Sequence, residues 1–264
     1  MSTLDCPKCG APQSANNAIC ERCGIVFEKY WKYHSRLGEG LAAAPAGSSR
    51  RRRGRRPPEQ GRLMALLLPR PAESDPLAVW AQAALLLVLA VWGLALIGSS
   101  VESNAAGKSF LHMVNLPFHE AGHVLFSPLG DFMHSLGGTL GQLLMPLVAM
   151  LVLLLKTRDP FGAAVAMWWF GENFLDIAPY IHDARALELP LLGGLDGASA
   201  PHGFHDWNYL LTESGLLFRD HELARASHLF GCLFMVLALL WGAALLYRAH
   251  LRQSQTDEAG RACA

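Results

Sequence analysis

The chain has 264 residues, of which 52% are hydrophobic and 17% are charged, and its 22 basic and 22 acidic side chains give a net charge of zero. This composition excludes a disordered or collagen-like chain, and the charged fraction is below the usual value of about a quarter for soluble domains. A zero net charge provides no overall field that would attract nucleic acid. The charges are nevertheless segregated, because residues 1–70 carry 13 basic and 5 acidic side chains whereas residues 71–264 carry 9 and 17.

Two CxxCG motifs lie within residues 1–34, with Cys6 and Cys9 in the first and Cys20 and Cys23 in the second. Two such turns supply the four thiolates of a tetrahedral structural zinc site. The alternatives are two disulfides or free thiols, and a reducing cytoplasm disfavours the disulfides. We therefore predict one structural zinc ion in a segment that resembles the short zinc ribbons at the front of many bacterial proteins. A closed site does no chemistry, so we expect the ribbon to bind a cytoplasmic protein partner.

Residues 35–76 are predicted to form a basic, proline-rich linker with too little apolar area to fold. Six arginines lie between Arg50 and Arg56. They would suit anionic lipid or nucleic acid, but they precede an apolar segment and have no interleaved aromatic residues. We therefore expect them to set the membrane topology and contact lipid headgroups, and we do not expect a nucleic-acid partner.

The rest of the chain is predicted to be an all-α polytopic membrane domain over residues 77–252. The stretch 78–98 carries no charge and is long enough to cross a hydrocarbon core of about 30 Å. In total we predict four spans, a further helix over 110–128, a loop over 183–227 and a tail over 253–264; the spans are 78–98, 139–155, 161–181 and 228–247.

Basic residues flank these spans unevenly. Arg62 and Arg70 precede the first span, Lys156 and Arg158 separate the second from the third, and Arg248 and Arg252 follow the last. Four spans place every one of these clusters on one side. We therefore predict an integral membrane protein of bacterial inner-membrane type. By the positive-inside rule its amino terminus is predicted to be cytoplasmic.

The segment 110–128 contains His119-Glu120-Ala121-Gly122-His123. On a helix the two imidazoles lie one turn apart on the same face, so both can bind one metal ion. Glu120 is then placed to act as the general base toward water. The motif also occurs by chance, but two histidines and a glutamate are costly in an apolar helix without a function. We predict a second zinc ion here and interpret the helix as cavity-lining rather than fully spanning.

At these residues the chain resembles the site-2-protease type of intramembrane zinc metalloprotease. The resemblance covers about residues 110–185 and implies His119 and His123 as zinc ligands, Glu120 as the general base and an aspartate as third ligand. In the family this aspartate follows an Asn…Pro segment, whose counterpart here starts at Asn173, and is usually followed by glycine, whereas Asp183 is followed by Ala184. Asp183 matches the family spacing best, and the alternatives are Asp176 and His205.

Three further features remain open at the level of sequence. Asn173, Asp176, Tyr180 and Asp183 share one helical face, which fits either a metal-site wall or helix-to-helix hydrogen bonds. The glycines of 137–141 fit close helix packing better than substrate binding. The pair His205-Asp206 fits either a further ligand or a residue that orients one.

The function predicted from these features is hydrolysis of peptide bonds in membrane or juxtamembrane segments by a membrane-embedded zinc metallopeptidase. The lipid bilayer and a membrane-protein or peptide substrate are its expected partners. The alternative is a non-catalytic zinc-binding membrane scaffold, or an interaction protein that uses the zinc ribbon as its partner module.

Overall fold

The computed structural model describes residues 3–14, 17–31, 64–69, 75–192, 194–201 and 203–262. The chain divides into two compact units, Met1–Arg56 and Pro57–Ala264. The described part is mostly helical. The Arg50–Arg56 run and most of the predicted linker lie outside the described residues.

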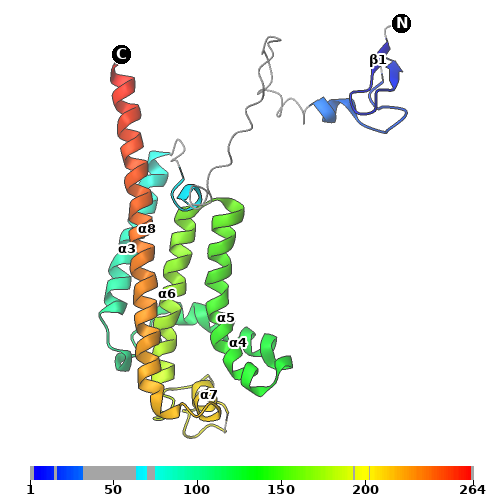
Figure 1. Cartoon of the computed structure of the whole chain (residues 1–264). Coiled ribbons are helices and arrows are strands. Elements are labelled where there is room, and N and C mark those ends of the chain that lie inside the picture. The colour runs from blue at the N-terminus through cyan, green and yellow to red at the C-terminus, as the bar shows by residue number, and fades with distance from the viewer. Residues whose placement is uncertain are drawn as a thin grey trace. The chain divides into compact units, whose positions relative to one another are not determined.

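The amino-terminal unit contains one small antiparallel sheet (Figure 1), in which β1 (Thr3–Asp5) pairs with β2 (Pro12–Ser14). An isolated antiparallel bridge joins Ile19 to Val26. Each CxxCG motif thus lies in a tight turn between short extended segments.

The larger unit is built of helices, four of which are long. Its elements in chain order are α3 (Pro76–Ile97), η1 (Val101–Ser103), α4 (Phe110–Phe126), η2 (Ser127–Leu129), α5 (Asp131–Val152), the π-helix η3 (Leu153–Thr157), α6 (Pro160–His182), α7 (Asp206–Glu213), η4 (Leu217–Arg219) and α8 (Asp220–Ala262).

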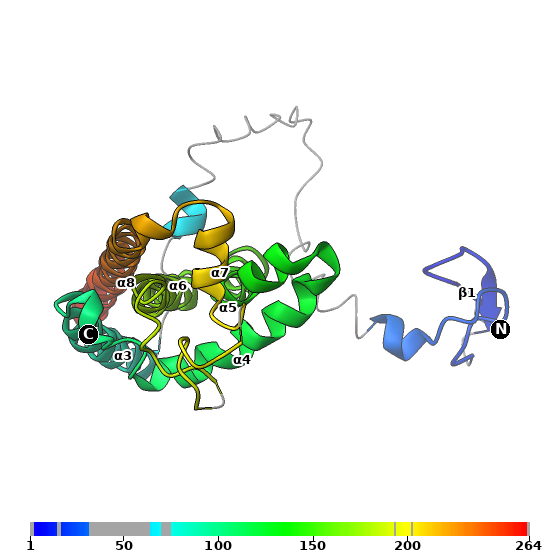
Figure 2. The same cartoon turned by 90° about the horizontal axis from the view of Figure 1, so that it is seen from below.

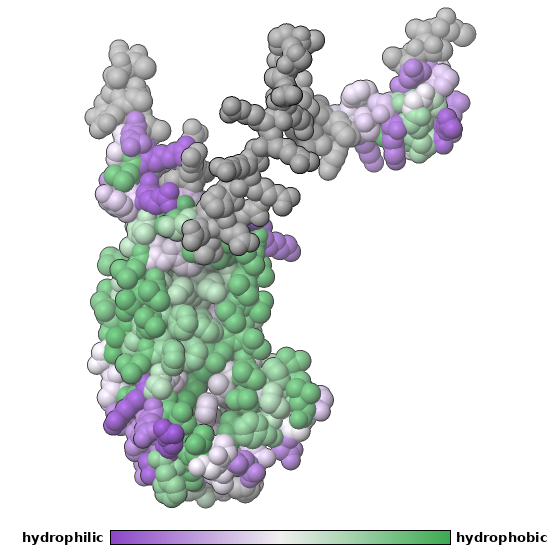
Figure 3. Space-filling model, in the orientation of Figure 1, coloured by the Kyte–Doolittle hydropathy of each residue, from purple (hydrophilic) through white to green (hydrophobic). Residues whose placement is uncertain are grey.

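Within the described part of the chain, three helical segments are long and apolar enough to cross a membrane: Pro76–Ile97, Asp131–Thr157 and Leu217–Gln255. They leave many large apolar side chains exposed, as expected of surfaces that face lipid. Figure 3 shows this apolar surface over the middle of the helical unit, between hydrophilic residues at its two ends. These three segments are consistent with an integral membrane protein.

Local sequence explains where two of the long helices begin. Asp75 caps α3, because its Oδ1 accepts a hydrogen bond from the backbone N–H of Leu77, and Pro76 follows at the first helical position. Asp159 caps α6 in the same way through Gly162, again with a proline next in the chain. An aspartate cap followed by proline satisfies a free N–H and presets the helical φ angle.

The helix that carries the HEAGH motif does not run along the bundle. Seen from below in Figure 2, α3, α6 and α8 appear end-on, whereas α4 runs sideways past them. It packs closely on α5 through glycines: a Cβ on Gly122 would lie 2.0 Å from the carbonyl oxygen of Gly137, and one on Gly141 2.3 Å from that of Phe118. Gly137 and Gly141 therefore serve the close helix packing that the sequence favoured.

Several boundaries differ from those predicted by hydropathy. Helix α5 begins at Asp131, eight residues before the predicted span. Hydropathy did not indicate this start, because the first turns of the helix are polar. Helix α8 runs for 43 residues and includes both the end of the predicted loop and the described part of the predicted tail. The loop over 183–227 also contains the short helix α7.

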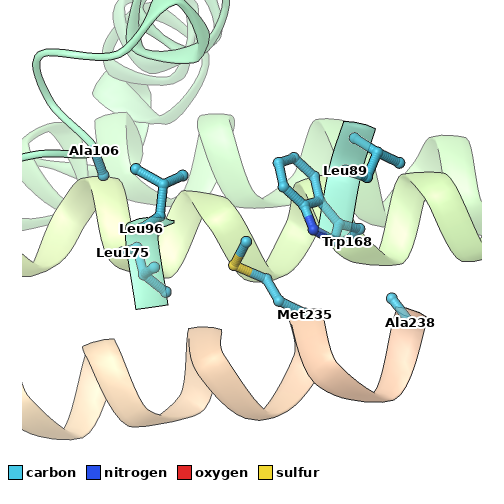
Figure 4. Packing of buried hydrophobic residues seen from close by; sticks show 7 residues of the cluster. All are labelled: Leu89, Leu96, Ala106, Trp168, Leu175, Met235 and Ala238. Atoms are coloured by element: carbon cyan, nitrogen blue, oxygen red, sulfur yellow. The ribbon is translucent and has the colours of Figure 1, made fainter. Parts of the chain in front are cut away.

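The core of the bundle lies between α3, α6 and α8. Trp168 and Leu175 of α6, Met235 of α8 and Leu89 of α3 belong to one buried cluster (Figure 4). Helix α6 is the most enclosed of the long helices, with fourteen buried residues along its length. Its polar residues are therefore covered by protein.

The two ends of the helical unit differ in charge. The turn between α5 and α6 and the last part of α8 lie at the same end (Figure 1), which brings Lys156, Arg158 and Arg248 to that end. Residues 64–69 lie there as well, because Trp241 and Arg248 of α8 donate hydrogen bonds to the carbonyl oxygens of Leu67 and Leu68. We call this the basic end.

Candidate metal centres

The four cysteines of the amino-terminal unit form a compact cluster. Cys6 Sγ lies 3.8 Å from Cys23 Sγ, and Cys9 Sγ lies 3.7 Å from Cys20 Sγ. Sulfur ligands at about 2.3 Å from a tetrahedral zinc ion are about 3.8 Å apart. The thiols are free, and all four sulfur atoms lie within 4.8 Å of one another. The cluster fits a zinc ion, in agreement with the spacing of the motifs.

The two motifs have the same backbone geometry. The N–H of Gly10 donates to the carbonyl oxygen of Cys6, and the N–H of Gly24 donates to that of Cys20. Both glycines have φ of 69°, in the left-handed region that favours glycine. This is why each CxxC pair is followed by glycine.

The HEAGH motif forms the second cluster. Ligand atoms of His119, Glu120 and His123 lie within 4.8 Å of one another. The nearest carboxylate to the two imidazoles is that of Asp206, in the first turn of α7: its Oδ2 lies 3.1 Å from His119 Nε2 and 3.4 Å from His123 Nε2. Nitrogen and oxygen ligands of a tetrahedral zinc ion are separated by about 3.3–3.4 Å.

The hydrogen bonds on the far side of each imidazole fix its tautomer. His119 Nδ1 donates to Gln142 Oε1 over 2.8 Å, and His123 Nδ1 donates to the carbonyl oxygen of His134 over 2.8 Å. The Gln142 amide is itself oriented, because its Nε2 donates to Asn173 Oδ1 and Asp176 Oδ2. A neutral imidazole with its proton on Nδ1 presents a lone pair at Nε2.

Two nitrogen lone pairs and one carboxylate oxygen therefore converge on the same space. Burial raises the pKa of the Asp206 carboxyl, but the neighbouring imidazoles of His119 and His123 lower it by more, so that the pKa lies below its ordinary value and the group is ionised at neutral pH. Three electron-rich atoms at this separation repel one another unless a cation lies among them. The donor set of two imidazoles and a carboxylate suits zinc.

A glycine makes room for that cation. A Cβ on Gly138 of α5 would lie 2.4 Å from His119 Nε2 and 2.6 Å from His123 Nε2. Any other residue at this position would fill the space in front of both nitrogen atoms. Gly138 thus differs from Gly137 and Gly141, which face the backbone of α4.

The structure gives Asp183 another role than the predicted one of third ligand. Its carboxylate accepts hydrogen bonds from the backbone N–H groups of Glu188 and Leu189 and from His205 Nε2. The carboxylate brought to the histidine pair is that of Asp206.

His205, the second alternative for the third ligand, also has both ring nitrogens engaged elsewhere. Its Nδ1 accepts from the N–H of Asn208 and so caps α7, while Nε2 donates to Asp183. Because His205 immediately precedes Asp206, this arrangement fixes the first turn of α7, from which Asp206 reaches His119. Asp183 and His205 therefore position Asp206.

Asp176, the first alternative, lies one layer behind the histidines. Its Oδ1 accepts from His112 Nδ1 at 2.9 Å, and its Oδ2 accepts from Asn115 and from Gln142. Asn115 also donates to Glu172, which is fully buried. The predicted polar stripe on α6 thus joins helix-to-helix hydrogen bonds, and through Gln142 it supports the orientation of His119.

A cavity of about 410 Å³ opens in front of the HEAGH cluster. Such a volume is within the range of about 300–1,000 Å³ that is typical of ligand pockets. His119 and Glu120 line it together with residues of both connecting loops, Asn104–Lys108 and Leu189–Leu192. A ligand in the cavity would therefore touch Glu120 and His119.

Sequence reasoning placed the residues of the HEAGH motif in one group and included Asp206 only as the neighbour of His205. It considered Gly138 and Gln142 only for close helix packing or substrate binding and did not single out His134. The signal for Asp206 was an acidic residue beside a histidine in the loop. The contact of Asp206 with His119 spans 87 residues of chain and depends on how the loop folds back, so no local spacing could indicate it.

No protein-family model, curated protein or solved structure matches this chain.

Proposed function

We propose that the protein is a membrane-embedded zinc metallopeptidase that hydrolyses peptide bonds in membrane or juxtamembrane segments. The observation that carries the proposal is the convergence of His119 Nε2, His123 Nε2 and Asp206 Oδ2 beside Glu120 at the wall of a cavity. An activity of the site-2-protease type, which the HEAGH motif suggests, agrees with this arrangement.

A zinc ion held by His119, His123 and Asp206 would act as a Lewis acid, which polarises a carbonyl group and lowers the pKa of water. The chain supplies the rest of the chemistry. Glu120 lines the cavity beside the histidines, so its carboxylate can take a proton from the attacking water and deliver it to the leaving amine. Gln142 and the carbonyl of His134 hold the imidazoles with Nε2 toward the ligand space.

We infer that α3, α5, α6 and α8 all cross the membrane and that α4 does not. Helix α6 has polar residues, but Glu172, Asn173 and Asp176 are buried within the bundle and not presented to lipid. With four crossings Lys156, Arg158 and Arg248 lie at one end, next to the spans, and the positive-inside rule places that end and the amino terminus in the cytoplasm. The charge pattern suits a bacterial inner membrane.

We assign the four-cysteine cluster to a zinc ribbon that holds a structural zinc ion and binds a protein partner. The sulfur separations of 3.7 and 3.8 Å support the metal. Because four thiolates fill a tetrahedral shell, this ion would have no position left for a substrate.

A zinc count combined with a peptidase assay tests the proposal. Wild-type protein purified in detergent should hold two zinc ions, one for each cluster, and should cleave a fluorogenic membrane peptide. The Glu120→Gln variant should keep both ions and lose cleavage. Glu213→Gln, the same change at an exposed position of α7, is the matched control and should retain activity.

The double variant Cys6→Ser, Cys9→Ser should retain one zinc ion, held by the HEAGH cluster. If it retains none, the HEAGH cluster does not bind zinc and the proposal fails. Wild-type protein that binds both ions yet cleaves no peptide in a broad screen would favour a zinc-binding scaffold.

A further inference from the structure

The cavity in front of the HEAGH cluster belongs to one end of the helical unit. Its lining includes Asn104, Gly107 and Lys108, which follow α3, and Leu189–Leu192, which follow α6, and of these Lys108 and Leu192 are exposed and mark its mouth. Both connections lie at the end of the bundle where α7 packs and α8 begins, opposite to the basic end (Figure 1).

The position of the HEAGH cluster along the helices gives its distance from the basic end. Gly138 faces the two Nε2 atoms from α5, and the continuous helix from there to Thr157 at the basic end rises by about 29 Å at 1.5 Å per residue. Tyr180 donates to Asp206, and α6 rises by about 30 Å between Pro160 and Tyr180. A hydrocarbon core is about 30 Å thick. The cluster is therefore one membrane thickness away from the basic end.

The HEAGH helix has the features of a helix that lies in a membrane interface. It runs across the bundle, as Figure 2 shows, and is 17 residues long. Phe110, Met113, Val124 and Leu125 are exposed along it, each by more than 60%. Apolar side chains on a transverse helix are accommodated at the boundary between headgroups and acyl chains. This places the cluster at the interface independently of the helix lengths.

We propose that the cavity opens at the membrane face opposite to the basic end, which is the non-cytoplasmic face, and that the enzyme acts on peptide segments that reach it from there. The substrate class is an extended segment at that interface, such as a loop or tail next to a membrane helix. The polar residues Lys108 and Asn104 and the apolar residues of Leu189–Leu192 in the lining of the cavity suit a segment that is partly in water and partly in lipid. The statement about substrate rests on the proposed function, whereas the sidedness of the cavity rests on the four proposed crossings and the positive-inside rule and not on peptidase activity.

Cysteine labelling tests the sidedness. Leu192 at the mouth is 63% exposed, and Thr157 at the basic end is exposed too. Leu192→Cys and Thr157→Cys are each introduced into full-length protein with Cys232→Ser and Cys263→Ser, and this parent sets the background. In sealed right-side-out membrane vesicles, a membrane-impermeant maleimide should label Leu192→Cys at once and Thr157→Cys only after permeabilisation. Labelling of both positions from the same side, or the reverse pattern, overturns the proposal.

Chelation tests the metal cluster itself. In the Cys6→Ser, Cys9→Ser protein the zinc ion counted is that of the HEAGH cluster. EDTA, which does not cross membranes, should remove it from right-side-out vesicles and leave it in inside-out vesicles, whereas permeant phenanthroline should remove it from both. Loss to EDTA in inside-out vesicles alone contradicts the proposal. If the variant holds no zinc at the outset, the proposed function fails, and the labelling pattern still decides the sidedness.

Discussion

Replacement of Gly138 by alanine tests the metal cluster with a single methyl group. The new Cβ would lie 2.4 Å from His119 Nε2 and 2.6 Å from His123 Nε2. Ordinary van der Waals contact begins near 3.4 Å, so the two rings would have to retreat by about 1.0 and 0.8 Å. Zinc sites tolerate ligand displacements of about 0.2 Å. Both imidazoles would thus leave the range in which they can bind one ion together.

We expect Gly138→Ala to lower the zinc affinity of the HEAGH cluster by more than about 100-fold, which exceeds the effect usual for loss of one supporting hydrogen bond. The zinc content should fall from two ions per chain to one. The fold should persist, since alanine is a better helix former than glycine by about 0.5–1 kcal/mol. Gly242→Ala is the control, because its Cβ would approach only side chains, chiefly that of Leu86.

The assay is elemental analysis of protein purified in detergent, followed by titration against a chromophoric chelator. Thermal unfolding of the metal-free proteins shows whether Gly138→Ala is folded. Retention of two zinc ions with wild-type affinity would refute the reasoning, because the metal could not then lie between the two Nε2 atoms.

Three further predictions concern the groups around the site. Asp206→Ala should reduce zinc affinity in chelator titrations by about 100-fold or more, since it removes a ligand, whereas Gln142→Leu should reduce it by about 10- to 100-fold through loss of the hydrogen bond to His119; equal wild-type affinity for both would contradict these roles. Burial raises the pKa of Asp183, but the hydrogen bonds from His205 and two backbone N–H groups lower it by more in sum, below the ordinary 3.8, so its contribution to stability is present above about pH 4 and lost as the pH falls below it. The thermal midpoint of metal-free wild type should therefore exceed that of Asp183→Asn at pH 7, and the difference should shrink as the pH falls below about 4; a constant difference would argue against this account. Arg185→Ala leaves the buried Asp220 carboxylate without its 2.7 Å partner and should destabilise the protein by about 1–3 kcal/mol in unfolding experiments. Loss of the exposed Arg219–Glu222 pair should cost less than about 1 kcal/mol. Similar costs for the two changes would show that burial of Asp220 has no effect.

Much of the architecture was predictable from local features of the sequence. Charge-free stretches identified the apolar parts of α3, α5 and α8, because the hydrocarbon core requires apolar residues along a length of about 30 Å. The polar first turns of α5 and α8 could not be found from hydropathy. Their polar side chains bind to neighbouring elements of the protein and do not face lipid. Asp220, for example, is buried against Arg185.

The candidate metal ligands likewise divide into those that the sequence identified and those that only the tertiary structure identified. Sequence by itself determined the CxxCG pairs and the histidines of HEAGH, because those ligands lie within one or two turns of backbone and their spacing fixes their geometry. Only the tertiary structure decided which carboxylate joins His119 and His123. Asp183 fits the sequence pattern, but the loop after α6 uses it to hold His205, and this contact brings Asp206 to the histidines.

Interpretation of the charge segregation also needed both the sequence and the tertiary structure. The sequence alone placed basic residues beside the apolar stretches, and the four crossings that we propose would put Lys156, Arg158 and Arg248 on one side. The transverse course of α4 and the depth of Gly138 within α5 follow from helix packing, since glycine-to-backbone contacts with α4 fix both. That packing sets the HEAGH cluster about one membrane thickness from the basic end, a distance that no local pattern in the chain encodes.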